Sequence, residues 1–103
     1  MSHEAHRVIA TDHPALAGHF HGDPVVPGVL ILDEVVRAVE QWRGQIRLKC
    51  ILSVKFTAAL RPGSTFSINL YDEDHSRIAF ECWHDGIRLA SGRLLVEYGA
   101  HAS

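Results

Sequence analysis

Two histidines and two carboxylates flank a segment rich in glycine and proline, and their types and spacing could support proton transfer. His19 and His21 stand in the stretch GHFHGDPVVPGVLILDE, and Asp33 and Glu34 follow His19 by fourteen and fifteen positions. A neutral imidazole can accept a proton near neutral pH, and a partly buried carboxyl group can hold one. The stretch therefore favours acid–base chemistry where a loop enters a helix.

The expected start of that helix supplies a second kind of group. Proline suits the first helical position, so the helix is predicted to begin at Pro27 with Val26 as its N-cap. Valine has no side-chain acceptor, which leaves the N–H groups of Gly28 and Val29 uncapped. Such donors suit a carbonyl oxygen that gains negative charge, and a glycine lets a substrate come close. The alternative is a helix start capped by water.

The sequence leaves open which of the two adjacent acids takes part. A helical wheel places Asp33 and Glu34 on opposite borders of the apolar arc. A carboxylate beside Val29 and Val36 would be partly desolvated, which would raise its pKa. Glu34 instead has Arg37 three positions on, a pairing typical of a solvated helix face.

A metal site is the competing interpretation of the same loop. His19, His21 and Asp23 form H-x-H-x-D, which is similar to the metallo-β-lactamase signature. That signature continues with a histidine directly after the aspartate, where this chain has Pro24. We therefore expect no metal.

The remaining sequence predicts the elements that position these groups. Residues 6–11 favour a strand and 11–26 a loop. A helix is expected over 27–43. Apolar residues alternate over 46–60, which predicts a long, curved strand with Cys50 on its inward face. Further strands are predicted at 64–71, 77–83 and 87–98, with a bulge at Gly92 where the apolar phase slips. Tight turns make the last strands antiparallel, so the fold class is α+β.

Length and charge limit the class of protein. The 103 residues fit one domain, 1–103, and leave enough apolar surface to favour an oligomer. The net charge is −2, yet residues 37–61 hold six basic residues and one acid, a local +5 that could recruit an acidic partner. No nucleic-acid motif, signal peptide or membrane span is indicated, and Cys50 and Cys82 are expected to be buried, reduced thiols. A cytoplasmic protein is expected.

The loop and helix start resemble the β-hydroxyacyl-acyl-carrier-protein dehydratases of bacterial fatty acid synthesis. Their pattern is histidine, phenylalanine, proline, glycine, any residue, proline, two variable residues, proline and glycine, with an acid fourteen positions after the histidine. This chain has HFHGDPVVPG from His19, with His21 in place of the family proline, and Asp33 at the acid position. An aspartate there is similar to the decanoyl-type branch.

The resemblance implies a hot-dog fold, in which an antiparallel β-sheet wraps a long central helix. It implies that His19 removes the C2 proton of a 3-hydroxyacyl thioester and that Asp33 expels the C3 hydroxyl as water or orients that water. The Gly28 N–H would polarise the thioester carbonyl, beside Phe20 and Val29 in the substrate site. The product would be a trans-2-enoyl thioester for fatty acid or specialised polyene or lipid synthesis.

The resemblance also implies partners. No cofactor is expected, since phosphopantetheine of an acidic acyl carrier protein bears the substrate. Arg43, Arg47 and Lys49 are the expected carrier contacts. The family's histidine and acid come from different subunits, so a homodimer, a higher oligomer or a heterodimer with a related subunit is expected. Two alternatives stay open: a hot-dog acyl thioesterase, and a non-catalytic acyl-binding partner subunit.

Overall fold

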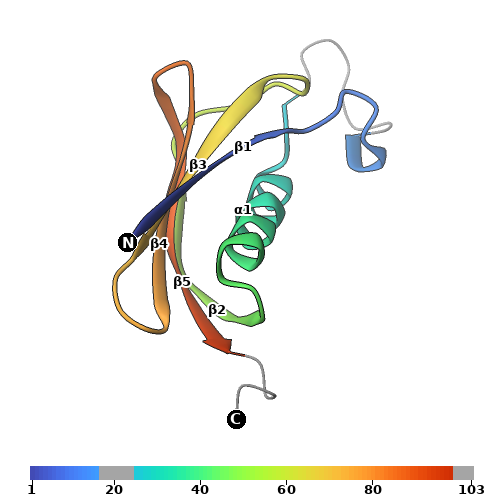
Figure 1. Cartoon of the computed structure of the whole chain (residues 1–103). Helices are drawn as coiled ribbons and strands as arrows, with labels where there is room; N and C mark the ends of the chain where they lie inside the picture. The colour runs from blue at the N-terminus through green and yellow to red at the C-terminus, as the bar shows by residue number, and fades with distance from the viewer. Residues whose placement is uncertain (17–24, 99–103) are drawn as a thin grey trace.

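One helix lies against a five-stranded antiparallel sheet in the computed structural model (Figure 1), which describes residues 1–16 and 25–98. The strands follow the order β1-β3-β4-β5-β2 across the sheet, so β1 and β2 are its edges. The predicted α+β class is confirmed. The elements in chain order are β1 (Ser2–Val8), η1 (Pro14–Leu16), α1 (Gly28–Arg43), β2 (Ile46–Phe56), β3 (Thr65–Asp72), β4 (Arg77–His84) and β5 (Ile87–Tyr98).

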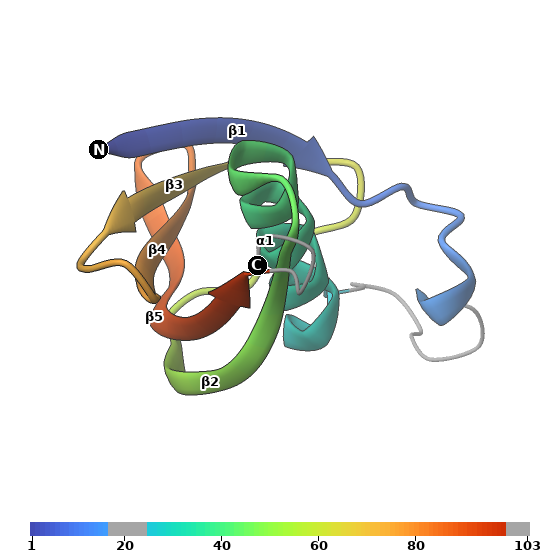
Figure 2. The ribbon, with the colours of Figure 1, turned by 60° about the horizontal axis from the view of Figure 1, so that its bottom comes forward.

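Helix α1 packs on one face of the sheet and contacts both edge strands, which lie on either side of it in Figure 2. Its apolar stripe at a spacing of three to four residues buries Ile31, Val35, Ala38 and Val39. The helix ends at Gly44, whose φ of 80° is the left-handed conformation that glycine adopts without strain. No helix of the described residues is long and apolar enough to cross a bilayer.

The core lies between α1 and the inner face of the sheet. A large apolar side chain that becomes fully buried there contributes roughly 1.5–3 kcal/mol to the stability of the fold. The sheet residues with at most 2% exposure include Phe66, Ile68, Leu70, Ile78, Phe80, Cys82, Leu89, Leu94 and Val96. The predicted burial of Cys82 is thus confirmed.

Strand β2 departs from the simple alternation that its sequence predicts. Its pairing with β5 skips a residue at Lys49 and again at Leu52, so each of these is a bulge. The first bulge inverts the faces, so that Ile51 takes the helix side and Cys50 turns to the outer side. The second bulge restores the original phase. The prediction that Cys50 is buried is therefore wrong, and its thiol is exposed.

Glycine 92 is not a bulge, because it stays in register with both neighbouring strands. Strand β5 does depart from regular pairing with β4, but nearer the β4–β5 hairpin, opposite Cys82 and Trp83. Gly92 permits close packing instead. A Cβ at this position would lie 2.3 Å from the Ser53 carbonyl oxygen and 2.8 Å from the Phe80 ring.

Candidate functional site

The N-terminus of α1 opens onto an apolar cavity of about 530 Å³. The helix is preceded by Pro27 rather than Val26 as N-cap, and no side chain caps it within the described part of the chain. A helix that begins at Gly28 leaves its first N–H groups without intrahelical acceptors. The cavity therefore lies beside backbone N–H groups that have no acceptor within the helix; among the described residues it is lined by Val25, Val26, Gly28, Val29, Ile31, Phe56, Ala58 and Ala59.

The backbone around the cavity is fixed by the segment that follows β2. The Val26 N–H donates to the Leu60 carbonyl oxygen at 2.8 Å, which holds the entry to α1 against this segment. At the end of β2, the Phe56 ring rests against Gly28, where a Cβ would come within 2.6 to 2.9 Å of three ring carbons. Glycine is thus required for the ring to lie where it does.

Asp33 lies on a stripe of α1 that its own sheet does not cover. Val29, Asp33 and Arg37 follow one another at four-residue spacing, and the side chains of Asp33 and Arg37 are 54% and 62% exposed. Val29 is 69% exposed, unusually open for an apolar residue. Arg37 contacts Asp33 Oδ2 through Nε at 3.2 Å and Nη2 at 3.1 Å. The expected pairing of Arg37 with Glu34 is therefore replaced by a pairing with Asp33.

Glu34 is used to attach an edge strand to the helix. Its carboxylate receives the Arg7 Nε of β1 at 3.2 Å, and both side chains are about one-fifth exposed. Arg7 also hydrogen-bonds Gln41 on the same helix, and His3 stacks on Trp42 with ring centroids 5.7 Å apart. These contacts give Glu34 a structural role and leave Asp33 as the acid on the open side of α1.

The other predicted site residues of the loop, His19 and Phe20, lie outside the described residues, as do His21 and Asp23 of the metal alternative. Within residues 1–16 and 25–98, no three histidine, cysteine or acidic side chains are grouped as a metal site would require. The metal interpretation of the loop is not tested by this observation.

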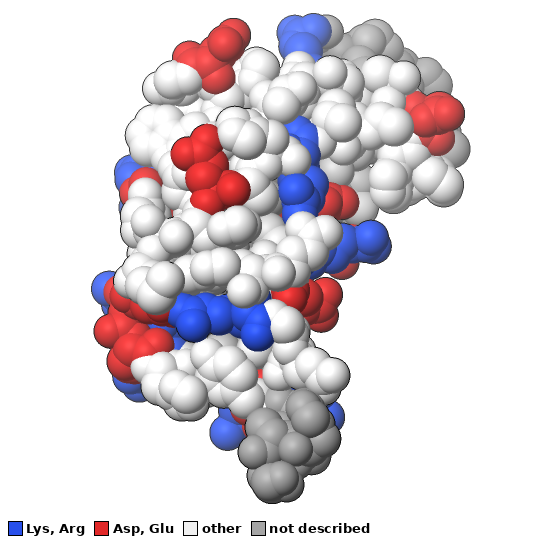
Figure 3. Space-filling model, in the orientation of Figure 1, with Lys and Arg blue, Asp and Glu red and all other residues white. Residues whose placement is uncertain are grey.

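Two of the three basic residues expected to meet a carrier protein, Arg43 and Arg47, are paired with acids of this chain. The Arg43 guanidinium carbon lies 4.1 Å from the centroid of the Trp42 ring, and Arg43 is paired with Asp72. Its positive charge is therefore largely neutralised within this subunit. Arg47 is 79% exposed but is paired with Glu97, whose hydrogen bond raises the pKa of Arg47. Figure 3 shows one face of the molecule, which is mostly uncharged and on which several groups of Lys and Arg lie beside Asp and Glu. The basic residues that give segment 37–61 its charge of +5 therefore do not form a continuous basic surface.

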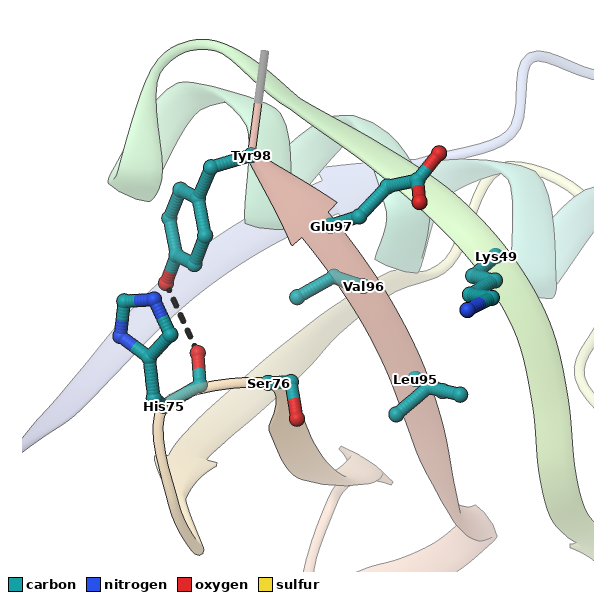
Figure 4. Close-up of a pocket in the computed structure, with 7 residues that line it drawn as sticks. All are labelled: Lys49, His75, Ser76, Leu95, Val96, Glu97 and Tyr98. Carbon is teal, nitrogen blue, oxygen red and sulfur yellow. Dashed lines mark hydrogen bonds between the residues drawn. The ribbon is translucent and has the colours of Figure 1, made fainter. Parts of the chain in front are cut away.

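A second cavity, of about 390 Å³, lies at the other end of β2 (Figure 4) and was not predicted from the sequence. Its residues come from the β3–β4 turn, β2 and the end of β5, and no motif links them. His75 is held by Tyr98, which stacks on its ring at 4.6 Å and donates from its hydroxyl to the His75 carbonyl oxygen at 3.1 Å. Glu97 is bound to Arg47, which lowers the pKa of Glu97. The cavity at Gly28 is therefore the better candidate site.

Solved structures with the same arrangement define the fold as a hot-dog fold. The dehydratase heterocomplex ApeI:P from Xenorhabdus doucetiae matches with a TM-score of 0.78 at 23% identity, over 92% of this chain and 86% of that chain. The fluoroacetyl-CoA thioesterase FlK matches with a TM-score of 0.63 at 17% identity, over 95% and 86% of the two chains. These likenesses extend to the fold alone.

The family follows from the sequence. Residues 2–93 match the model of the ApeI-like family, described as ApeI dehydratase, and the chain belongs to this family. The 3-hydroxyacyl-acyl-carrier-protein dehydratase FabZ of Levilactobacillus brevis is 39% identical over 59 residues, half of this chain and 40% of that protein. FabZ of Latilactobacillus sakei is 30% identical over 74 residues, 64% of this chain and 53% of that protein. The chain thus spans about half the length of the curated relatives it matches, or less.

Proposed function

We propose that the protein dehydrates 3-hydroxyacyl thioesters to trans-2-enoyl thioesters. The observation that carries this proposal is the apolar cavity at the uncapped start of α1, with Asp33 five residues further along the helix. Five residues of helix rise by about 7.5 Å, a span suited to a thioester carbonyl at one end and a C3 hydroxyl at the other. Membership of the ApeI-like family and the likeness to FabZ support the same reaction.

The proposed reaction moves one proton and one hydroxyl. The thioester oxygen accepts the Gly28 N–H, which stabilises the charge that develops when His19 takes the proton from C2. Electrons from the broken C–H bond form the C2–C3 double bond, and the C3 hydroxyl takes up the proton that His19 removed, either directly or through Asp33, and leaves as water. Arg37 engages Asp33 through Oδ2, which leaves Oδ1 to meet that hydroxyl or the departing water.

We further propose that the working unit pairs two hot-dog subunits along β2. This edge strand carries exposed Ile51, Leu52 and Val54, an apolar edge that proteins ordinarily cover. The exposed stripe with Val29 and Asp33 needs a second subunit to enclose it. The match to a heterocomplex subunit supports pairing with either a second copy or a related chain.

The reaction is tested with carrier proteins loaded with 3-hydroxyacyl groups of different lengths. Mass spectrometry is expected to show loss of one water, and ultraviolet absorbance is expected to show the conjugated enoyl thioester, without release of thiol. Release of free thiol without enoyl formation would instead identify a thioesterase. A third outcome is that the protein binds the acyl carrier substrate, forms no enoyl product and releases no thiol, but restores dehydration when it is mixed with a related subunit. That outcome would identify a non-catalytic partner.

The subunit pairing is tested by a charge on the β2 edge. Val54→Arg is expected to shift the sedimentation of the protein toward the monomer and to abolish dehydration, because the arginine would have to be desolvated in the interface. Ile87→Arg is the matched control, since Ile87 is similarly exposed but lies at the β4–β5 hairpin. A Val54→Arg protein that remains dimeric and active would exclude this edge.

We retain the acyl carrier protein as the proposed partner, with Arg47 and Lys49 as its main contacts and Arg43 as a weaker one. Lys49→Glu is expected to raise KM for the carrier-bound substrate severalfold and to leave KM for the same acyl group on pantetheine alone unchanged. An equal change for both substrates would refute carrier recognition there. The proposed compartment is the cytoplasm, where the exposed Cys50 thiol would stay reduced.

A further inference from the structure

We propose that Phe56 determines which acyl groups fit the cavity at the start of α1. This inference rests on the proposed acyl thioester function and adds a residue that sets its specificity. The starting observation is the contact between the Phe56 ring and Gly28, where the absence of a side chain lets three ring carbons approach the backbone. The ring thus stands beside the amide that is proposed to bind the thioester oxygen.

The position of Phe56 makes it a wall of the cavity rather than part of the core. It is the last residue of β2 and pairs with buried Ala90, so it faces the helix side of the sheet. Its side chain nevertheless remains 46% exposed. A ring supported by Gly28 on one side and open on the other contributes little to the core, so its removal should leave the fold intact.

Phe56 is also the largest side chain that lines the cavity. Its neighbours on the same segment, Ala58 and Ala59, are small, and the residues contributed by α1 and its entry are aliphatic or glycine. The volume of the cavity therefore depends more on Phe56 than on any other described lining residue. Exposed Ala59 offers the opposite change, because a longer side chain there would fill space that is now empty.

The chemistry places the ring where acyl groups differ. A thioester whose oxygen meets the Gly28 N–H must extend its carbon chain along the apolar wall next to that amide. Hydrophobic pockets distinguish substrates by about tenfold or more per methylene when space is limiting. A ring at this point favours short or narrow acyl groups over long or bulky ones.

The test compares 3-hydroxybutyryl and 3-hydroxydecanoyl thioesters of pantetheine as substrates of the intact protein. For Phe56→Ala, the ratio of kcat/KM for the long over the short substrate is expected to rise about tenfold. Ala59→Leu is expected to lower that ratio, and Phe56→Tyr to preserve it. Ile87→Ala is the matched control: it removes an exposed apolar side chain at the start of β5, outside both the cavity and the β2 edge, and should leave the ratio unchanged.

Binding separates failure of this inference from failure of the proposed reaction. Calorimetric titration with butyryl and decanoyl pantetheine, which cannot be dehydrated, gives an affinity ratio that is independent of turnover. If wild-type protein forms no enoyl product but Phe56→Ala still shifts this affinity ratio, the reaction is wrong and the size filter stands. Unchanged ratios in Phe56→Ala and Ala59→Leu, or no binding of either thioester by the wild type, would overturn the inference.

Discussion

Asp33 and Arg37 form an ion pair, with Oδ2 3.1 Å from Nη2, on the side of α1 that its own sheet leaves open. The adjacent acid, Glu34, is paired with Arg7 and fastens β1 to the helix. Two neighbouring carboxylates thus have different surroundings, one available to a substrate or a partner subunit and the other committed to the fold. This difference favours Asp33 over Glu34 as the acid of the proposed reaction.

Replacement of each acid should separate chemistry from stability. Asp33→Asn is expected to lower kcat for dehydration by about 10²–10⁴, the usual contribution of an acid–base group, while the protein remains folded. Glu34→Gln is expected to leave kcat within a few fold and to reduce the free energy of unfolding by about 1 kcal/mol, as one arginine contact weakens. Kinetics and urea denaturation measure the two effects. A large kcat loss in Glu34→Gln with none in Asp33→Asn would reverse the assignment.

The close approach of strands at Gly92 gives a prediction about stability. Gly92→Ala is expected to destabilise the protein by about 3 kcal/mol, the upper part of the range for overpacking, because the methyl group meets a backbone oxygen as well as the Phe80 ring. Urea denaturation measures the loss. Ser91→Ala, at the neighbouring half-buried position, is the control and should change stability by only about 0.5 kcal/mol. Equal effects at the two positions would show that β5 can move away from Ser53.

The two thiols should differ in reactivity. Burial raises the pKa of Cys82 to about 12, so almost none of it is thiolate at neutral pH, whereas Cys50 is exposed on the outer side of β2. Iodoacetamide is expected to alkylate Cys50 in the folded protein and Cys82 only after denaturation. Peptide mass spectrometry, with Cys50→Ser as control, reads this directly. Rapid labelling of Cys82 in that variant would mean that β4 opens readily.

The turn between β3 and β4 should make stability depend on pH. Asp74 accepts the Ser76 N–H at 2.9 Å and the Arg77 N–H at 3.0 Å, and its other oxygen receives the Arg77 Nη1 at 2.9 Å. These bonds, led by the one from the Ser76 backbone, hold the pKa of Asp74 below its usual value. The ionised carboxylate therefore stabilises the fold above about pH 4, and this contribution is lost as the pH falls through the lowered pKa.

Comparison of Asp74→Ala with wild type checks this sign. The wild type is expected to be more stable at pH 7, with the difference narrowing as the pH is lowered below about 4. Ser76→Ala keeps the backbone bonds and should keep the pH dependence. A difference between wild type and Asp74→Ala that is the same at every pH would show that the turn does not depend on the charge of Asp74.

Local patterns predicted most of the elements, although the first strand lies at Ser2–Val8 rather than at 6–11. Long-range pairing explains what the patterns missed. The boundaries of α1 and β5 follow from proline, glycine and apolar periodicity, which act within a few residues. The partner of Glu34 could not be read from the helix, because Arg7 comes from a strand that only the fold brings near. The cavity wall at Phe56 was missed for the same reason, since its contact is with Gly28 across the domain.

The faces of β2 were mispredicted because apolar residues alternate through both bulges without a break. Which residues are left unpaired depends on the ladder with β5 and on the curvature around α1, and neither is encoded in a period of two. Arg43 shows the same limit for charge: its basic neighbours in sequence suggested an open surface, whereas Asp72 and Trp42 enclose it.

The paired bulges of β2 also bear on insertions and deletions. Lys49 and Leu52 have no partner of their own in the ladder, so deleting either one would leave every remaining pair with β5 opposite its present neighbour. Deleting any other residue of the strand would shift a stretch of the ladder and turn its side chains to the wrong face. Deletions in β2 among natural variants should therefore occur mainly at these two positions. Each such deletion should remove a bulge and reduce the curvature of the sheet around α1.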